Sequence, residues 1–220
     1  MGIISIEQAD RLYWLGRYTE RVYTTLRMFS KSFDCLIDGI ADSYVDFCKS
    51  IDIPNVYSDK NDFVKRYPFD AELSDSIISN LNRAYDNAIV LRESIGSECL
   101  AYIQLAIYEM NKAATSKSPL IELQKVNDNI LAFYGTADDL IDSQNIRNII
   151  KAGKRIERID LYARLGVEKK EISREIHRMI PRVERSGLDY DKEKLQRILD
   201  LVSEDSIDYY KVVNEVETVF

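Results

Sequence analysis

The residues of this sequence that could do chemistry are charged side chains in one short pattern that occurs twice. The pattern is a glycine, a basic residue, then a glutamate and an arginine, with another arginine six residues later. The first copy contains Gly16, Arg17, Glu20, Arg21 and Arg27, and the second contains Gly153, Lys154, Glu157, Arg158 and Arg164. Each second-copy position lies 137 residues after its counterpart. Arginine can hold a carboxylate or phosphate with two parallel hydrogen bonds, so this set could bind an anion or form internal ion pairs.

Helical periodicity around both copies predicts that each lies on an amphipathic helix. In helical projection the glycine, the glutamate and the later arginine of each copy lie in or beside the apolar stripe. Arg21 and Arg158 point away from it and are therefore the better surface or ligand candidates. Buried charges need partners, because an unpaired one costs several kcal/mol.

We therefore expect the two copies to face each other, with Glu20 towards Arg164 and Glu157 towards Arg27. Asp160 is four residues before Arg164 and could pair with it on the same helix. Three interpretations of this arrangement stay open. It is a structural polar layer that fixes helix register, a ligand or partner site, or a coincidence.

Composition limits the function classes. The chain has 220 residues, 45% hydrophobic and 30% charged, which fits one domain or two small ones. The net charge of −7 argues against nonspecific nucleic-acid binding. The three cysteines lack zinc-ligand spacing, and His177 is the one histidine. We therefore expect no cofactor and no imidazole metal site, while a carboxylate-only site stays open.

The cysteine pattern favours a reducing compartment, so the expected location is cytoplasmic. No run of 18 apolar residues is present, so we expect no membrane span. The first residues have no basic region followed by a long apolar core, so we expect no signal peptide.

Apolar residues recur every three to four positions almost throughout. Helices are predicted over residues 5–39, 41–53, 59–67, 74–110, 119–133, 143–165, 168–185, 192–202 and 207–219. The 74–110 stretch would be one helix kinked near Gly96 or two nearly collinear helices. Ser5 and Gln8 form a capping-box pattern, and Pro181 would kink or end its helix near Ile180.

The predicted fold is all-α. It is a multi-helix bundle with long antiparallel helices, in which the two Gly-x-x-x-Glu-Arg helices face each other. Residues 1–166 would form the core, and the short helices of 167–220 would pack on or extend the same domain. The basic residues of 168–185 alternate with glutamates, which predicts a solvated, salt-bridged face.

Four stretches resemble the bacterial alpha-E domain family, an uncharacterised helical family with a Glu-Arg motif. They are Leu12–Arg21 with Arg27, Asn87-Ala88 with Arg92 and Glu98, Phe133-x-Gly135, and Gly153–Asp160 with Arg164. The resemblance implies a setting beside, or fused to, a circularly permuted ATP-grasp protein and often a transglutaminase-like protein.

The function expected from this resemblance is a non-catalytic helical accessory or interaction protein in an ATP-grasp-associated system that ligates or modifies peptides. One alternative is an enzyme or ligand-binding protein whose paired Glu and Arg residues grip a carboxylate or phosphate. A second is a structural homo-oligomer. No catalytic residue is assigned. The candidate ligand, partner or polar-layer residues are Arg17, Glu20, Arg21, Arg27, Arg92, Glu98, Glu157, Arg158, Asp160 and Arg164.

Overall fold

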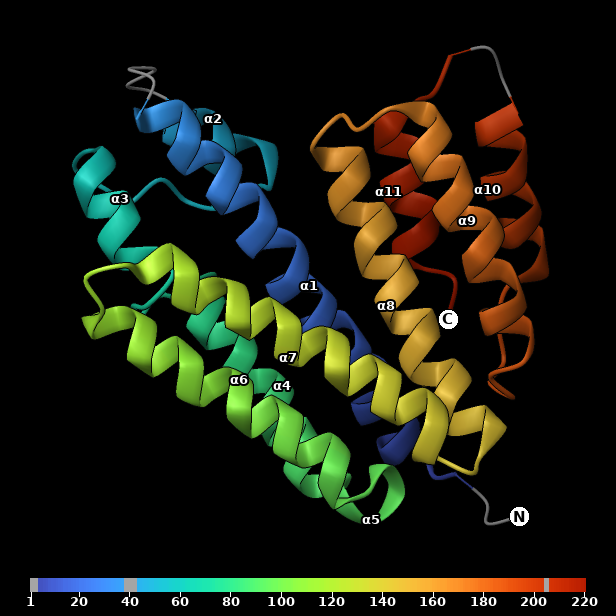
Figure 1. Cartoon of the computed structure of the whole chain (residues 1–220). Helices are drawn as coiled ribbons and strands as arrows, with labels where there is room; N and C mark the ends of the chain where they lie inside the picture. Colours follow the sequence, from blue (N-terminus) through green and yellow to red (C-terminus); the bar gives the residue numbers. More distant parts are fainter. Residues whose placement is uncertain (1–3, 38–42, 204–205) are drawn as a thin grey trace.

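The computed structural model describes residues 4–37, 43–203 and 206–220, with the backbone alone for 32–37. Within these ranges the chain forms helices and no strand. The helices are α1 (Ile6–Ile37), α2 (Ser43–Ser50), α3 (Lys60–Arg66), α4 (Ile77–Val90), α5 (Arg92–Ile95), α6 (Ser97–Thr115), α7 (Pro119–Leu140), α8 (Gln144–Arg164), α9 (Lys169–Glu184), α10 (Lys192–Ser203) and α11 (Tyr209–Glu217). The all-α multi-helix prediction is confirmed (Figure 1).

Helix α1 begins with half of the predicted capping box. The Ser5 hydroxyl accepts a hydrogen bond from the Gln8 backbone N–H at 3.1 Å, as predicted. The Gln8 side chain does not return to the cap, because its amide donates to Ser94 Oγ at 2.6 Å. This contact ties the start of α1 to α5, 86 residues away. The predicted stop at Gly39 lies outside the described residues.

The prediction of one long or two collinear helices over 74–110 is wrong. The chain leaves the helix at Leu91, forms the short α5, and turns at Gly96, whose φ of +84° is a conformation that suits glycine. Helices α4 and α6 then lie side by side, and the Gln104 amide of α6 donates to the Tyr85 hydroxyl of α4 at 3.1 Å. The apolar period continues through the turn because both helices bury a face in the same core.

Two predicted helix ends do not occur, whereas the kink that was the other expectation at Pro181 stays a prediction. Helix α7 continues through Tyr134 and Gly135 to Leu140, because Phe133 and Ala137 on either side are buried and hold that turn in the core. Helix α9 continues past Pro181 to Glu184. Its buried Met179 and Val183 flank the proline and hold the last turn in place.

The buried apolar side chains form two clusters that meet at α8. The larger cluster unites α1 to α7 with one face of α8, which contributes Ile146, Ile149 and Ile150. The smaller cluster joins the other face of α8, including Ile156 and Ile159, to α9, α10 and α11. Figure 1 shows α6 and α7 as antiparallel neighbours on one side of α1, and α9 to α11 gathered beside α8 on the other. Helix α8 is therefore the element common to both cores.

Candidate functional site: the crossing of the two Glu-Arg helices

Helices α1 and α8 make the most extensive helix pairing of the fold, and they cross at the two pattern glycines. A Cβ on Gly16 would lie 2.1 Å from the Ile150 carbonyl oxygen, and one on Gly153 would lie 2.2 Å from the Tyr13 carbonyl oxygen. Ile150 is the position 137 residues after Tyr13, so the two contacts are equivalent. The crossing thus has approximate two-fold symmetry, and backbone contact at its centre requires glycine on both helices.

Beyond the glycines, each glutamate pairs with the arginine of the other copy. Arg158 Nε and Nη2 donate to Glu20 Oε1 and Oε2 at 2.6 and 2.9 Å. Arg21 Nε donates to Glu157 Oε1, and Arg17 Nε donates to Glu157 Oε2 at 2.6 Å. The Glu20 and Glu157 side chains are 0% and 1% exposed, so both carboxylates are sealed inside the crossing.

These contacts confirm that the two copies face each other and correct the predicted partners. Glu20 does not face Arg164, and Glu157 does not face Arg27. Arg21 and Arg158 are not free for a ligand either, because they neutralise the two buried carboxylates, although the Arg21 side chain stays 31% exposed. The projection failed because it places Cβ atoms, whereas an arginine side chain is long enough to reach around its own helix to an adjacent one.

The second basic position breaks the symmetry. Arg17 bonds Glu157, but its counterpart Lys154 lies with Nζ 3.3 Å from the centre of the Tyr134 ring. Burial lowers the pKa of Lys154 to about 7, although nearby Glu20 opposes the shift. Glu20 instead takes its further hydrogen bond from the Thr24 hydroxyl, at 2.8 Å. The two glutamates are thus equally buried, but Glu157 is paired with two arginines and Glu20 with one arginine and a threonine.

Sequence reasoning missed the most buried further charge of this network, Glu175 of α9. It was expected on a solvated face, yet its side chain is 1% exposed. Arg155 donates to Glu175, Arg178 Nη1 donates to it at 2.9 Å, and Arg158 Nη1 lies 3.8 Å away. Burial alone would raise the pKa of Glu175, but Arg155 and Arg158 outweigh it and lower the pKa. Its spacing of three, four and eight residues from the buried Ile172, Met179 and Val183 was the available signal, because residues at these spacings share one face of a helix.

The later arginines do not belong to the sealed layer. Arg27 is exposed, with its guanidinium 5.6 Å from the centre of the Tyr23 ring. Arg164 donates to Asp160 Oδ1 at 2.9 Å, which confirms the predicted pair within α8. Burial, followed by the charge of Glu157, raises the pKa of Asp160.

The two remaining candidates lie apart from the crossing. Arg92 and Glu98 are both exposed near the α5–α6 turn, and Arg92 Nε donates to Ser97 Oγ at 3.2 Å. Neither therefore joins the buried polar layer.

The crossing holds two helices in fixed register with every glutamate oxygen already accepting a hydrogen bond. A ligand would have to break these buried pairs to reach the carboxylates. Among the described residues, no group of three or more His, Cys, Asp or Glu side chains could hold a metal ion. No helix in the described ranges is long and apolar enough to cross a membrane.

Comparison with known proteins identifies the pattern. A model of the Alpha-E family, described as a predicted alpha-helical domain with a conserved ER motif, matches residues 7–214. The match extends beyond residue 166, so it takes in helices α9, α10 and most of α11. Searches of curated proteins and of solved structures found no match. Since the family model covers nearly the whole chain, the protein belongs to the Alpha-E family.

Proposed function

We propose that this chain is a non-catalytic helical accessory protein that binds a partner in an ATP-grasp-associated system that ligates or modifies peptides. The observation that supports a binding role is the closure of the Glu-Arg layer. Glu20 and Glu157 are fully occupied by Arg17, Arg21 and Arg158 in the crossing, so this part of the motif builds a rigid scaffold and leaves recognition to the outer surface. We place this role in the cytoplasm. The partner would be a circularly permuted ATP-grasp protein, and a transglutaminase-like protein could join it.

The exposed surface of α6 and α7 is the proposed docking surface. Of the large hydrophobic side chains that are exposed, five lie on these two helices: Leu105, Tyr108, Ile121, Leu131 and Leu140. Leu105 and Tyr108 are one turn apart on α6 and are 46% and 63% exposed. Leu105 and Tyr108 therefore share one face of α6, and exposed apolar side chains that lie together on one face are a common feature of protein–protein interfaces.

Co-expression with a circularly permuted ATP-grasp protein of the same organism tests this proposal. We expect the two proteins to elute together from a size-exclusion column, and Leu105→Glu combined with Tyr108→Glu to abolish the complex. Glu193→Lys on α10 is the control, since its side chain is 91% exposed and Figure 1 shows α10 away from α6 and α7. If the two wild-type proteins elute separately at tens of micromolar, the proposed partnership is wrong.

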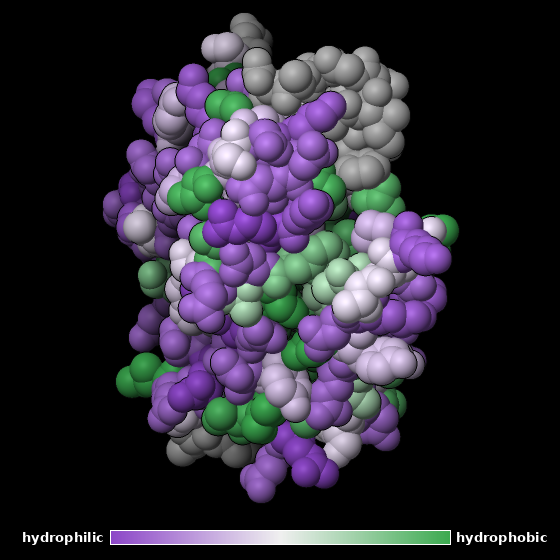
Figure 2. Space-filling view, turned by 90° about the vertical axis from the view of Figure 1, so that its left-hand side faces the viewer, coloured by the Kyte–Doolittle hydropathy of each residue, from purple (hydrophilic) through white to green (hydrophobic). Residues whose placement is uncertain are grey.

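The two alternatives have less support. A grip on carboxylate or phosphate needs free arginines beside Glu20 and Glu157, whereas Arg21 and Arg158 already bind these carboxylates. A homo-oligomer needs a broad apolar face, and on the face that Figure 2 shows, hydrophobic residues lie in small groups among hydrophilic ones. Light scattering of the isolated chain tests the second alternative, since a stable oligomer would show a multiple of the 25.5 kDa chain mass.

A further inference from the structure

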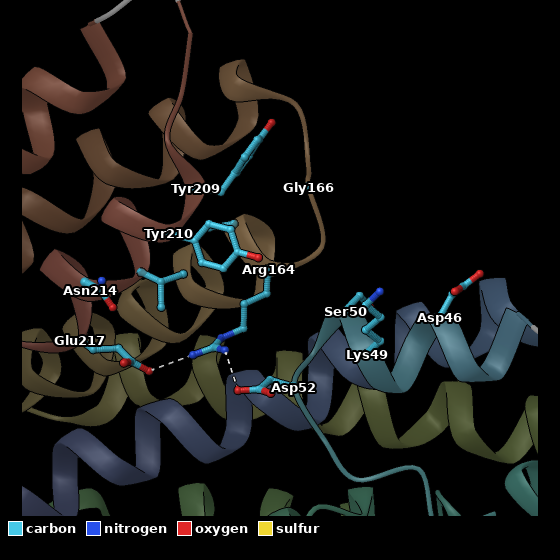
Figure 3. Close-up of a pocket in the computed structure, with 12 residues that line it drawn as sticks. Asp46, Lys49, Ser50, Asp52, Arg164, Gly166, Tyr209, Tyr210, Asn214 and Glu217 are labelled. Carbon is cyan, nitrogen blue, oxygen red and sulfur yellow. Dashed lines mark hydrogen bonds and ion pairs between the residues drawn. The ribbon is translucent and has the colours of Figure 1, made fainter.

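A pocket in the described part of the chain lies away from the Glu-Arg crossing (Figure 3). It has a volume of about 740 Å³ and is lined by α2, by the end of α8 and by α11. This volume is within the range of sites for small organic molecules. Arg164 lies between the two sides of the pocket, with Asp52 on one side and Glu217 on the other.

The arginine of this pocket is already neutralised. Asp160, buried behind it, accepts from Arg164 Nε at 2.9 Å. Asp52 and Glu217 accept from Nη1 and Nη2 at 3.4 Å each. The Asp52 and Glu217 side chains are 86% and 38% exposed, so they keep lone pairs that face solvent and the pocket. The carboxylates of Asp52 and Glu217 are thus more accessible to a ligand than the guanidinium of Arg164.

The charge balance around the pocket is negative. Asp46, Asp52 and Glu217 line it against Lys49 and Arg164. Buried Asp160 adds a fourth carboxylate to these three, so that four negative charges oppose two positive ones.

Two helices add to this negative field, because both end at the pocket. Helix α2 contributes its last residues Lys49 and Ser50, and α8 contributes its last turn with Ala163 and Arg164. The carboxyl end of a helix carries a partial negative charge and carbonyl oxygens without intrahelical partners. Helix ends and side chains therefore favour the same sign of ligand, a cation.

An aromatic ring completes the site. Tyr210 lines the pocket and is 85% exposed, and Figure 3 shows its ring beside Arg164. Neighbouring Tyr209 also lines the pocket, and its hydroxyl donates to the Val167 carbonyl at 3.3 Å, which holds it in place. The face of a tyrosine ring attracts ammonium and guanidinium groups.

We propose that this pocket binds an organic cation with an ammonium or guanidinium group, held by Asp52 and Glu217 beside the ring of Tyr210. The same chemistry is offered by a free polyamine and by a lysine or arginine side chain of a peptide. The site is separate from the α6–α7 surface, so this proposal does not depend on the proposed partner and can be tested without it.

Calorimetric titration of the full chain at low salt tests the site. The probes are spermidine, the blocked amino acids N-acetyl-lysine amide and N-acetyl-arginine amide, and N-acetyl-glutamine amide as the neutral control. We expect at least one cationic probe to bind tenfold or more tightly than the neutral one. Spermidine as the tightest ligand would indicate a polyamine site, and a blocked basic amino acid as the tightest would indicate a peptide side chain.

Variants separate the pocket from the general acidity of the protein. Asp52→Asn combined with Glu217→Gln should weaken binding of the tightest probe at least tenfold, with an unchanged circular dichroism melting curve. Glu193→Gln on α10 removes an exposed carboxylate elsewhere and should leave the affinity unchanged. The assignment is overturned if no cationic probe binds at millimolar concentration, if the double variant binds as tightly as the wild type, or if Glu193→Gln weakens binding as much.

Discussion

At the scale of single residues, Gly16 and Gly153 set how closely α1 and α8 approach. A Cβ at either position would overlap a backbone carbonyl of the opposite helix, and a backbone cannot rotate away as a side chain can. Gly16→Ala and Gly153→Ala should therefore each destabilise the protein by about 1–3 kcal/mol, the usual cost of overpacking, or more. Urea denaturation followed by circular dichroism measures this difference.

Gly135 is the internal control for this prediction. It also lies within a helix, but a Cβ there has no atom within 4 Å. Gly135→Ala should stabilise α7 by up to about 1 kcal/mol, because alanine has the higher helix propensity. If all three alanine variants had similar stabilities, close approach would not be the role of the pattern glycines.

Lys154 makes the stability of the protein depend on pH. Its pKa is about 7 in the fold, whereas lysine in an unfolded chain titrates near pH ~10.4. Between these values the unfolded state binds a proton that the folded state does not, so the free energy of unfolding should rise with pH. The rise is at most about 1.4 kcal/mol per pH unit, and it begins as the pH increases through 7.

Urea denaturation of the wild type and of Lys154→Met between pH 6 and 9 isolates this contribution. This range lies below the titration of the buried tyrosines, of which Tyr134 has a pKa that burial raises well above its ordinary value. We expect the wild type to gain stability relative to the variant across the range. A constant difference between the two proteins would show that Lys154 keeps its ordinary pKa in the fold.

At the scale of elements, the ion pairs between α1 and α8 fix the register of the crossing. Glu20→Ala leaves Arg158 almost buried without its main partner and should cost about 3–5 kcal/mol, as should Arg158→Ala. The double variant should cost less than the sum of the two by about 0.5–3 kcal/mol, because the second change removes the charge that the first left unpaired. Denaturation of the four proteins of this cycle measures the coupling.

Two further cycles act as controls. Glu193 and Arg197 on α10 are exposed and 3.9 Å apart, so their coupling should be below about 1 kcal/mol. Glu20 and Arg164 do not pair, and their substitutions should add within about 0.5 kcal/mol. A strong coupling of Glu20 to Arg164, with none to Arg158, would restore the pairing that the helical projection favoured.

The sequence contained enough information to place the two pattern helices against each other but not to assign their pairs. The constant offset and the glycines require a symmetric close contact, which the structure confirms. Partner assignment depends on how far each arginine side chain reaches, and on Thr24 and Glu175, which lie outside the pattern. These contacts depend on the packing of α1 and α9 against α8, which periodicity along one helix does not contain.

The same limit explains the errors in the helix boundaries. Around Gly96 the apolar period continues because α4 and α6 share one core, so the turn leaves no break in the pattern. Around Gly135 the local residues favour an end, but burial of Phe133 and Ala137 keeps the helix intact. Local propensity is worth about 1 kcal/mol per residue, which is less than the burial of one large side chain. Tertiary packing therefore determines that the chain turns at Gly96 and stays helical at Gly135.

At the scale of the whole molecule, α8 is the structural link between the two apolar clusters. One face of α8 packs on α1, and a neighbouring face carries Ile156 and Ile159 into the cluster of α9 to α11. Glu175 of α9 also reaches Arg158, which itself holds Glu20 of α1. Loss of either cluster would expose a buried face of α8 and leave part of this charge network unpaired.

We therefore expect the chain to unfold as one cooperative unit. Leu81→Ala in the larger cluster and Ile198→Ala in the smaller one remove fully buried side chains and should each cost about 2–5 kcal/mol. In scanning calorimetry each variant should show a single transition at a lower temperature, with equal calorimetric and van't Hoff enthalpies. A separate early transition in Ile198→Ala, with the main transition unmoved, would mean that α9 to α11 unfold on their own. In that case the crossing of α1 and α8 would stay folded after α9 has unfolded, so the contact of Glu175 with Arg158 would not be needed for its stability.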